Sequence, residues 1–195
     1  RAATRISSSG PATRLIDALK RSRSVTLEAW VRPANDHQEG PARIVSISAS
    51  PNLRNITLGQ DSRQYDVRLR TSSTTTNGMP STSTRPGTAG TALAHVVYTR
   101  DPSGTARIYV DGKPAASKRI AGHLGNWDNR FRLLLGNEGS GDRPWLGAIH
   151  LVAIYNRALS ANEVQQNHRA GAAAGYQPPR ELAMQRRQRF FETRI

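Results

Sequence analysis

Cysteine is absent from this chain of 195 residues, and aromatic residues and long apolar runs are scarce. Without cysteine the chain forms no disulfide, a state that fits the cytosol and is also compatible with export. No apolar run approaches the roughly 20 residues that a membrane-spanning helix needs. Residues 1–10 lack the apolar segment of a signal peptide, so we expect any targeting signal to lie outside this chain.

Acidic residues are also few, because 14 Asp and Glu stand against 28 Lys and Arg, for a net charge of +14. Much of the surplus lies in the flanks: residues 1–25 carry six basic and one acidic side chain, and residues 172–195 carry five and two. A nucleic-acid groove would need basic residues interleaved with aromatic ones for stacking, but aromatics make up only 6%. We therefore expect no specific nucleic-acid binding, only nonspecific attraction to polyanions.

Short segments of alternating apolar and polar residues make up most of the chain. Residues 25–32, VTLEAWVR, place Val25 and Leu27 on one face and Thr26 and Glu28 on the other. The same reasoning predicts strands at 44–48, 55–60, 65–70, 95–100, 106–110, 113–117 and 132–136, with a short surface helix within 11–24. Many short strands with little helix predict an all-β fold, a sandwich of two antiparallel sheets.

Two connections between these strands differ in predicted length: one is a tight turn and the other a long loop. Asp111-Gly112 separates two strand-like runs and predicts a tight hairpin, because both turn positions need a positive φ. Residues 71–92 are rich in Ser, Thr, Gly and Pro and predict a long loop or a ragged edge strand. Long loops in compact domains are often binding loops, but we favour a disordered or crossover connection here.

The stretch from 145 to 171 predicts the closing unit of the domain. Apolar residues run almost unbroken from Leu146 to Tyr155, as in a strand that is buried on both faces or whose buried face the pattern does not define. Ser160 and Glu163 stand three residues apart and predict a capping box at the start of a short helix. Gly171 is expected to end that helix in the left-handed conformation.

These segments in this order resemble the laminin-G-like, concanavalin A-like superfamily over residues 12–171. The resemblance rests on VTLEAWVRP, HVVYTRD, ARIYVDGKPAAS and WLGAIHLVAIYNRALSANEV. RIVSIS, NITLGQD, YDVRLRT and GDRPWLG are similar to a subgroup found in large modular proteins of planctomycete bacteria. The resemblance implies a jelly-roll sandwich that binds sugars, matrix or proteins without catalysis.

The two ends are expected to lie outside this domain, with 1–11 as an N-terminal flank and 172–195 as a linker that opens a following module. Pro178-Pro179 marks the linker, and RELAMQRRQRFFETRI is similar to the segment that opens a planctomycete-type cytochrome c domain. Because the chain has no cysteine, it holds no c-type haem itself, and we expect no cofactor other than calcium. The resemblance implies a multidomain, exported parent protein whose neighbouring domains are partners of this one.

Catalysis finds little support in the residues. A glycoside hydrolase needs two carboxyl groups across a groove, and catalytic members of the superfamily often place acids as E-x-D-x-x-E on one strand, a run that is absent here. Glu28 and Asp66 lie in separate strands beside arginines, and Glu28 is expected to pair with an arginine such as Arg32. The five histidines have no zinc-like spacing. We expect no enzymatic activity.

Candidate ligand contacts lie in the loop 126–129. Trp127 stands among Asn126, Asp128 and Asn129, where a ring could stack on a sugar while the polar side chains bind hydroxyl groups. The alternative, held equally, is that Trp127 folds back as a lid over the core.

The other candidates are structural. Trp145 is expected to pack at a sheet end, Trp30 in the core or between the sheets, and Asp142 and Arg143 to form an ion pair.

Calcium is possible at Asp128, Asn137 and Asp142, since it takes oxygen ligands, but turns use the same residues. Many relatives have Asp at the position of His150, which puts a calcium site of the family type in doubt. The sequence thus predicts a noncatalytic module for a glycan or another extracellular ligand. The alternatives are a structural or protein-interaction domain that positions a redox neighbour and, more distantly, a hydrolase-like enzyme.

Overall fold

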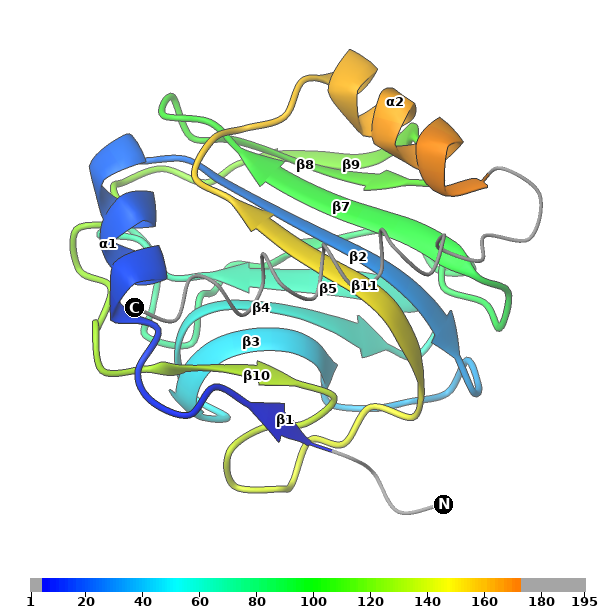
Figure 1. The fold of residues 1–195 in the computed structure, drawn as a ribbon, viewed down its shortest axis with the longest axis horizontal. Coiled ribbons are helices and arrows are strands. Elements are labelled where there is room, and N and C mark those ends of the chain that lie inside the picture. The colour runs from blue at the N-terminus through cyan, green and yellow to red at the C-terminus, as the bar shows by residue number, and fades with distance from the viewer. Residues whose placement is uncertain (1–4, 173–195) are drawn as a thin grey trace.

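A computed structural model describes residues 5–172 and shows a sandwich of two antiparallel sheets (Figure 1). The six-stranded sheet has the order β1 (Ile6–Ser7), β10 (Arg132–Leu135), β3 (Ala42–Ser50), β4 (Leu53–Asp61), β5 (Gln64–Leu69) and β6 (Thr82–Ser83). The five-stranded sheet has the order β11 (Gly147–Tyr155), β2 (Val25–Pro33), β7 (Ala94–Arg100), β8 (Thr105–Val110) and β9 (Lys113–Arg119). The predicted all-β sandwich is confirmed.

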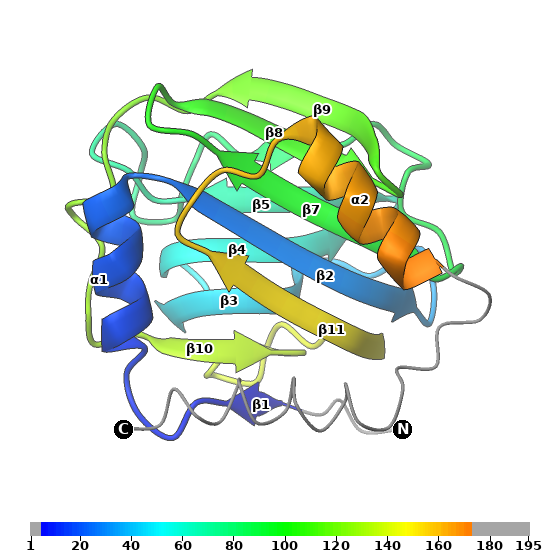
Figure 2. The ribbon, with the colours of Figure 1, turned by 45° about the horizontal axis from the view of Figure 1, so that its top comes forward.

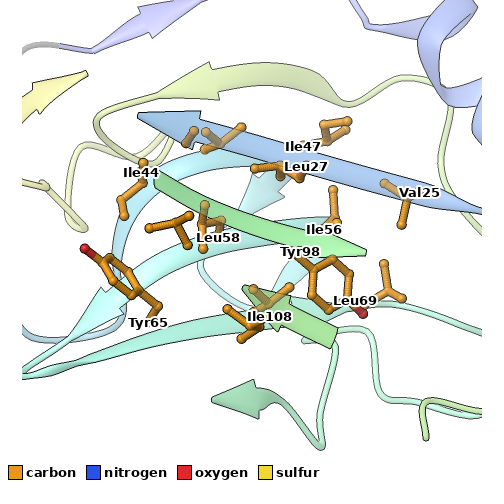
Figure 3. Close-up of a cluster of buried hydrophobic side chains, with 14 of the residues drawn as sticks. Val25, Leu27, Ile44, Ile47, Ile56, Leu58, Tyr65, Leu69, Tyr98 and Ile108 are labelled. Carbon is orange, nitrogen blue, oxygen red and sulfur yellow. The ribbon is translucent and has the colours of Figure 1, made fainter. Parts of the chain in front are cut away.

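The core fills the space between the two sheets. Alternation along β2 turns Val25 and Leu27 inward, where they meet residues such as Ile47, Ile56 and Leu58 from the opposite sheet (Figure 3). All five side chains are essentially inaccessible to solvent. Burial of branched and aromatic side chains at this density is the main force that holds the sheets together.

The hairpin between β8 and β9 has the predicted turn. Asp111 and Gly112 adopt φ angles of 50° and 73°, the values that match the twist of the flanking strands. The side chain of Asp111 also accepts a hydrogen bond from the backbone N–H of His95, at 2.9 Å. This turn therefore delivers β9 to the free edge of its sheet.

The N-terminal part of the chain joins the sandwich earlier than expected. β1 lies within the predicted flank 1–11, yet it pairs with β10. Helix α1 (Thr13–Ser22) then covers one end of the sandwich (Figure 2) and buries Ile16 and Leu19. No helix within residues 5–172 is long and apolar enough to cross a membrane.

Helix α2 (Ala161–Ala172) packs on the outer face of the five-stranded sheet (Figure 2). Its capping box is confirmed, because Ser160 N donates to Glu163 Oε2 at 2.8 Å and Glu163 N donates to Ser160 Oγ at 3.3 Å. The expected stop at Gly171 is wrong, since the helix continues to Ala172. A Cβ on Gly171 would lie 2.4 Å from Trp30 Cζ2, so close helix–sheet packing explains this glycine. The predicted linker and following module in residues 173–195 lie outside the residues that the structure describes.

Residues 71–92 form the expected long connection, interrupted only by β6, which pairs with β5. The loop folds back against the six-stranded sheet: Arg54 N donates to Thr76 O at 3.1 Å, and a Cβ on Gly78 would lie 2.7 Å from Leu69 N. The connection thereby covers polar residues on that sheet and brings β6 to an edge of the sandwich.

Candidate functional site

Two neighbouring hollows open where the edges of the two sheets meet. β6 ends the six-stranded sheet and β9 ends the five-stranded sheet, and β6 lies against β8 and β9. The larger hollow measures about 860 Å³ and the smaller about 410 Å³, and they share Ser83, Ala116 and Ser117. We call the two hollows together the edge groove. Its size is within the range of ligand pockets in proteins.

Small residues on β9 leave room for the groove. Ala115, Ala116 and Ser117 occupy the middle of that strand, and Pro114 precedes them. The remaining lining comes from the segment 79–86, from β5 and β8, and from the start of α2: Gln64, Met79, Pro80, Ser81, Thr82, Thr84, Arg85, Pro86, Arg107, Tyr109, Lys118 and Ala161. Proline and alanine carbons thus alternate with hydroxyl groups along the groove.

Two hydrogen bonds hold polar groups of the groove in place. Ser83 Oγ donates to Asp66 Oδ2 at 2.8 Å, and Lys118 Nζ donates to Ser81 O at 2.8 Å, which ties β9 to the segment before β6. The hydroxyl of Thr82 is buried and has no hydrogen-bond partner among the described residues, whereas Ser83 and Ser117 are exposed. A ligand with hydroxyl groups would find both donors and acceptors here.

The groove is positively charged. Arg85, Arg107 and Lys118 line it, whereas no Asp or Glu does. The side chains of Arg85 and Arg107 are exposed and make no hydrogen bond or salt bridge to another residue of the described range, although the charge of Arg107 acts on the nearby carboxyl of Asp101. The lining therefore contains no carboxyl group to act as a general acid, base or nucleophile.

The loop 126–129 does not form a binding site of the expected kind. Trp127 is only 2% exposed, and its Nε1 donates to Arg70 O at 2.7 Å. The stacking role proposed for Trp127 is corrected, because a ring buried in the core has no free face for a sugar. Asn126 Nδ2 donates to Thr71 O at 2.9 Å, and Asn129 Oδ1 accepts from Lys20 Nζ at 3.0 Å.

The proposed calcium ligands are engaged in turns. Arg130 Nη2 donates to Asp128 Oδ2 at 2.7 Å. Hydrogen bonds from the side chain and the backbone N–H of Arg130 lower the pKa of Asp128 to about 2. Asn137 Oδ1 accepts from the backbone N–H of Arg143 at 3.0 Å, and the expected pair of Asp142 and Arg143 forms at 3.3 Å. Within residues 5–172 no group of three or more His, Cys, Asp or Glu side chains is placed to hold a metal ion.

Comparisons with known proteins agree with this architecture. The sequence model of the concanavalin A-like lectin/glucanase superfamily, of the laminin G type, matches residues 7–165. The chain belongs to this superfamily. No curated protein matches its sequence.

Solved structures share the fold of this superfamily member at low identity. One is a predicted carbohydrate-binding protein of Bacteroides ovatus, with 21% identity, a TM-score of 0.54 and coverage of 74% of this chain and 40% of the other. Another is botulinum neurotoxin type C, whose cell entry depends on interaction with two ganglioside molecules. It has 13% identity and a TM-score of 0.62, with coverage of 85% of this chain and 42% of the other. A third is the heptameric SAP-like pentraxin of Limulus polyphemus, with 14% identity, a TM-score of 0.58 and coverage of 80% of this chain and 73% of the other. The superfamily member thus spans about two fifths of the first two proteins.

A second polar cluster of this superfamily member lies under α2 and was predicted only in part. Glu28 was expected to pair with an arginine, but His95 Nε2 donates to its Oε1 at 2.9 Å. Tyr155 and Asn167 donate to Oε2, each at 2.9 Å. Burial alone would raise the pKa of Glu28, but the bond from His95, with those from Tyr155 and Asn167, holds it below its ordinary value.

Trp30 covers this cluster. Its ring stacks on His95 at 4.7 Å and on His168 at 5.7 Å between centroids. Trp30 is buried as expected, but between the five-stranded sheet and α2 rather than between the two sheets. Trp145 is also buried, and its Nε1 donates to Gln60 Oε1 at 2.9 Å.

The acid–histidine pair of Glu28 and His95 is unsuited to substrate chemistry. Their side chains are 5% and 0% exposed, so no substrate reaches them. Glycoside hydrolysis needs two carboxyl groups that face the sugar from both sides. The edge groove offers none, and the buried pair instead fastens α2 to β2 and β7.

Sequence reasoning missed the edge groove. Its lining residues come from separate parts of the chain, 64, 79–86, 107–118 and 161, and no local motif joins them. Two signals were available: the length of the loop 71–92, part of which lines the groove, and β9, a strand of small and charged residues, KPAASKR, typical of a sheet edge.

Proposed function

We propose that this chain is a noncatalytic recognition module that binds a glycan in the edge groove. The observation that carries the proposal is a ligand-sized groove lined by hydroxyl groups, proline and alanine carbons and cations, without a carboxyl group. Apolar carbons suit the C–H faces of sugars, and hydroxyl groups suit their O–H groups. Superfamily membership and the carbohydrate-binding description of the Bacteroides relative support the same function.

The context of the module is also a proposal. We infer an exported parent protein in which residues 172–195 connect this domain to a following module, because laminin-G-like domains are common in such proteins. Weak binding at one groove would then gain strength from several copies or neighbouring domains.

A glycan array, probed with the purified chain at physiological salt, tests the proposal. Ser117 is exposed, lines both hollows and makes no side-chain hydrogen bond within the described range. Ser117→Trp should fill the groove and abolish binding to the glycans that the wild type retains. Lys113→Trp, at an exposed position of the same strand outside the groove, is the matched control and should keep binding.

Two outcomes would contradict the proposal. If the wild type retains no glycan, or if both variants bind as the wild type does, the groove is not a glycan site. A structural or protein-interaction role would then be favoured. A hydrolase would be indicated instead if a retained glycan were shortened during incubation, which mass spectrometry of the eluted glycan would reveal.

A further inference from the structure

We infer that the glycan bound in the edge groove is an acidic polysaccharide, recognised through its sulfate or carboxylate groups. This inference rests on the proposed function and names the chemical class of its ligand. The observation behind it is the unbalanced charge of the groove: Arg85, Arg107 and Lys118 line the two hollows, and no acidic residue does.

Six other arginines of the described range have a carboxylate partner. Arg43 binds Glu138 at 3.3 Å, and Arg68 binds Asp66 at 3.2 Å. Some exposed arginines also have one, since Arg130 binds Asp128 and Arg157 binds Glu163, at 2.7 Å and 2.6 Å. The three cations of the groove form no salt bridge within the described range. Burial would raise the pKa of Asp101, but hydrogen bonds from Ser103 and Thr105, together with the charge of nearby Arg107, hold it below its ordinary value.

One acidic side chain contacts a lining residue of both hollows. Asp66 lies behind Ser83, and its Oδ2 accepts a hydrogen bond from Ser83 Oγ at 2.8 Å. Its other oxygen accepts from Arg68 Nε at 3.2 Å. Asp66 is therefore neutralised from inside the sheet and does not offset the cations on the other side of Ser83.

The arrangement of the cations favours a chain-like ligand over a single sugar. Arg107 stands opposite Ser117 in the register of β8 and β9, and Lys118 is the next residue of β9. Successive side chains of a strand point to opposite faces. Arg107 and Lys118 therefore lie on opposite sides of the free edge, Arg107 in the larger hollow and Lys118 in the smaller one.

A ligand that contacts both cations must cross the edge of the sheet. Ser83 and Ser117 lie on this path, because they belong to both hollows. An extended polymer with acidic groups on successive sugars fits this path, with one acidic group near Arg85 and Arg107 and another near Lys118. Arginine suits such groups because its planar fork donates two parallel hydrogen bonds to a carboxylate or sulfate.

Single-stranded nucleic acid, the other common polyanion, fits the groove less well. Its binding relies on aromatic rings that stack on successive bases. Tyr109 is the aromatic residue of the lining, and it is only 3% exposed. We therefore assign the groove to a polysaccharide and make nucleic acid an outcome of the test.

The test measures binding of the whole chain to four probes by isothermal titration calorimetry at physiological salt: dextran sulfate, alginate, dextran and a single-stranded DNA. The groove variant is Arg85→Gln with Arg107→Gln. The control variant, Arg32→Gln with Arg132→Gln, removes the same charge from exposed positions outside the groove. Lys118→Gln tests the smaller hollow separately.

We expect dextran sulfate or alginate to bind and dextran not to bind. The groove variant should weaken the acidic polysaccharide about 10-fold or more, since the loss of a charge-assisted hydrogen bond costs on the order of 1.5–3 kcal/mol. The control variant should change affinity by less than about 3-fold, because distant exposed charges are screened. Preference between dextran sulfate and alginate distinguishes sulfate from carboxylate recognition.

Three results would overturn the inference. If the groove and control variants lost affinity for the polysaccharide equally, the net charge of the protein alone would explain the binding. DNA binding as tight as that of the polysaccharide would point to an unspecific polyanion surface. Binding of only neutral glycans, lost in Ser117→Trp, would keep the proposed function and reject the acidic class. If Ser117→Trp removed no glycan binding of any kind, the proposed function itself would be rejected.

Discussion

Arginines gather in two regions of this protein, and the two differ in both burial and pairing. On the outer face of the six-stranded sheet, Arg43 and Arg54 are 1% and 0% exposed. In the edge groove, Arg85 and Arg107 are exposed and form no salt bridge within the described range. The same residue type thus serves stability where carboxylates and loops enclose it. It is left free for a ligand where they do not.

The enclosed region depends on one carboxylate. Glu138 accepts from Arg43 Nε at 3.3 Å and from Ser48 Oγ at 2.7 Å. Burial lowers the pKa of Arg43, and Glu138 offsets part of that shift.

Its neighbour Arg54 has no such partner. Nη1 donates to Thr57 Oγ1 at 3.3 Å, whereas Nε and Nη2 have no partner in the described range. Burial, together with the charges of Arg43 and Arg68, lowers the pKa of Arg54 to about 9. The enclosed region therefore contains one arginine that supports the fold and one that strains it.

The largest effect is expected for Glu138→Gln, which leaves the buried Arg43 without a counter-charge. Removing one partner of a buried ion pair costs about 3–5 kcal/mol of unfolding free energy. Urea denaturation measures the loss. Glu163→Gln is the control, because the Arg157–Glu163 pair is exposed and an exposed pair contributes less than about 1 kcal/mol. Equal losses in both variants would show that the buried pair has no special role.

Glu28→Gln should have the next largest effect, about 2 kcal/mol, since hydrogen bonds to a charged group contribute roughly 1.5–3 kcal/mol. The pKa of Glu28 lies below its ordinary 4.5 in the folded state. Its charge therefore stabilises the protein above that pH, and the contribution is lost as pH falls through the folded pKa. Denaturation of the wild type and the variant from pH 7 to pH 3 should show their difference shrinking below about pH 4.5. A difference that is independent of pH would contradict this assignment.

Arg54→Met should change stability in the opposite direction. Replacing a buried charge by an apolar side chain of similar length is often neutral or stabilising by about 1–4 kcal/mol, and we expect a gain of about 1 kcal/mol. Arg43→Met is the matched comparison and should destabilise the protein, because it leaves Glu138 buried alone. If Arg54→Met also destabilised it, Nε and Nη2 would have partners in solution.

The smallest stability effect is expected in the groove. Arg85→Gln with Arg107→Gln should change the unfolding free energy by no more than about 0.5 kcal/mol, as surface substitutions usually do. Thermal unfolding measures this directly. A clear loss would mean that these side chains support the fold, and the contrast between the two arginine regions would disappear.

Local features were predictable because their causes are local. The alternation in 25–32, the turn at Asp111-Gly112 and the capping box of Ser160 and Glu163 each depend on residues within a few positions of one another. Backbone sterics and short-range hydrogen bonds suffice to specify them. For the same reason the longer strands were located correctly to within a few residues, whereas the two-residue strand β1 was not predicted.

Side-chain environments were less predictable. Trp127 stands in a polar loop, yet it is buried, because Arg70, distant in the sequence, supplies the partner for its N–H. Glu28 has an arginine four residues away, but the register of β2 and β7 brings His95 to its carboxylate instead. Gly171 was interpreted as a helix stop because the contact with Trp30 cannot be inferred from neighbouring residues.

The sequence by itself therefore determined the strands, the tight turn, the helix start and the superfamily, since these depend on short-range pattern and order along the chain. The tertiary structure alone decided which arginines are paired, which tryptophans are buried and where the groove opens. Those properties depend on how the two sheets pack and where their edges meet, and long-range contacts set both.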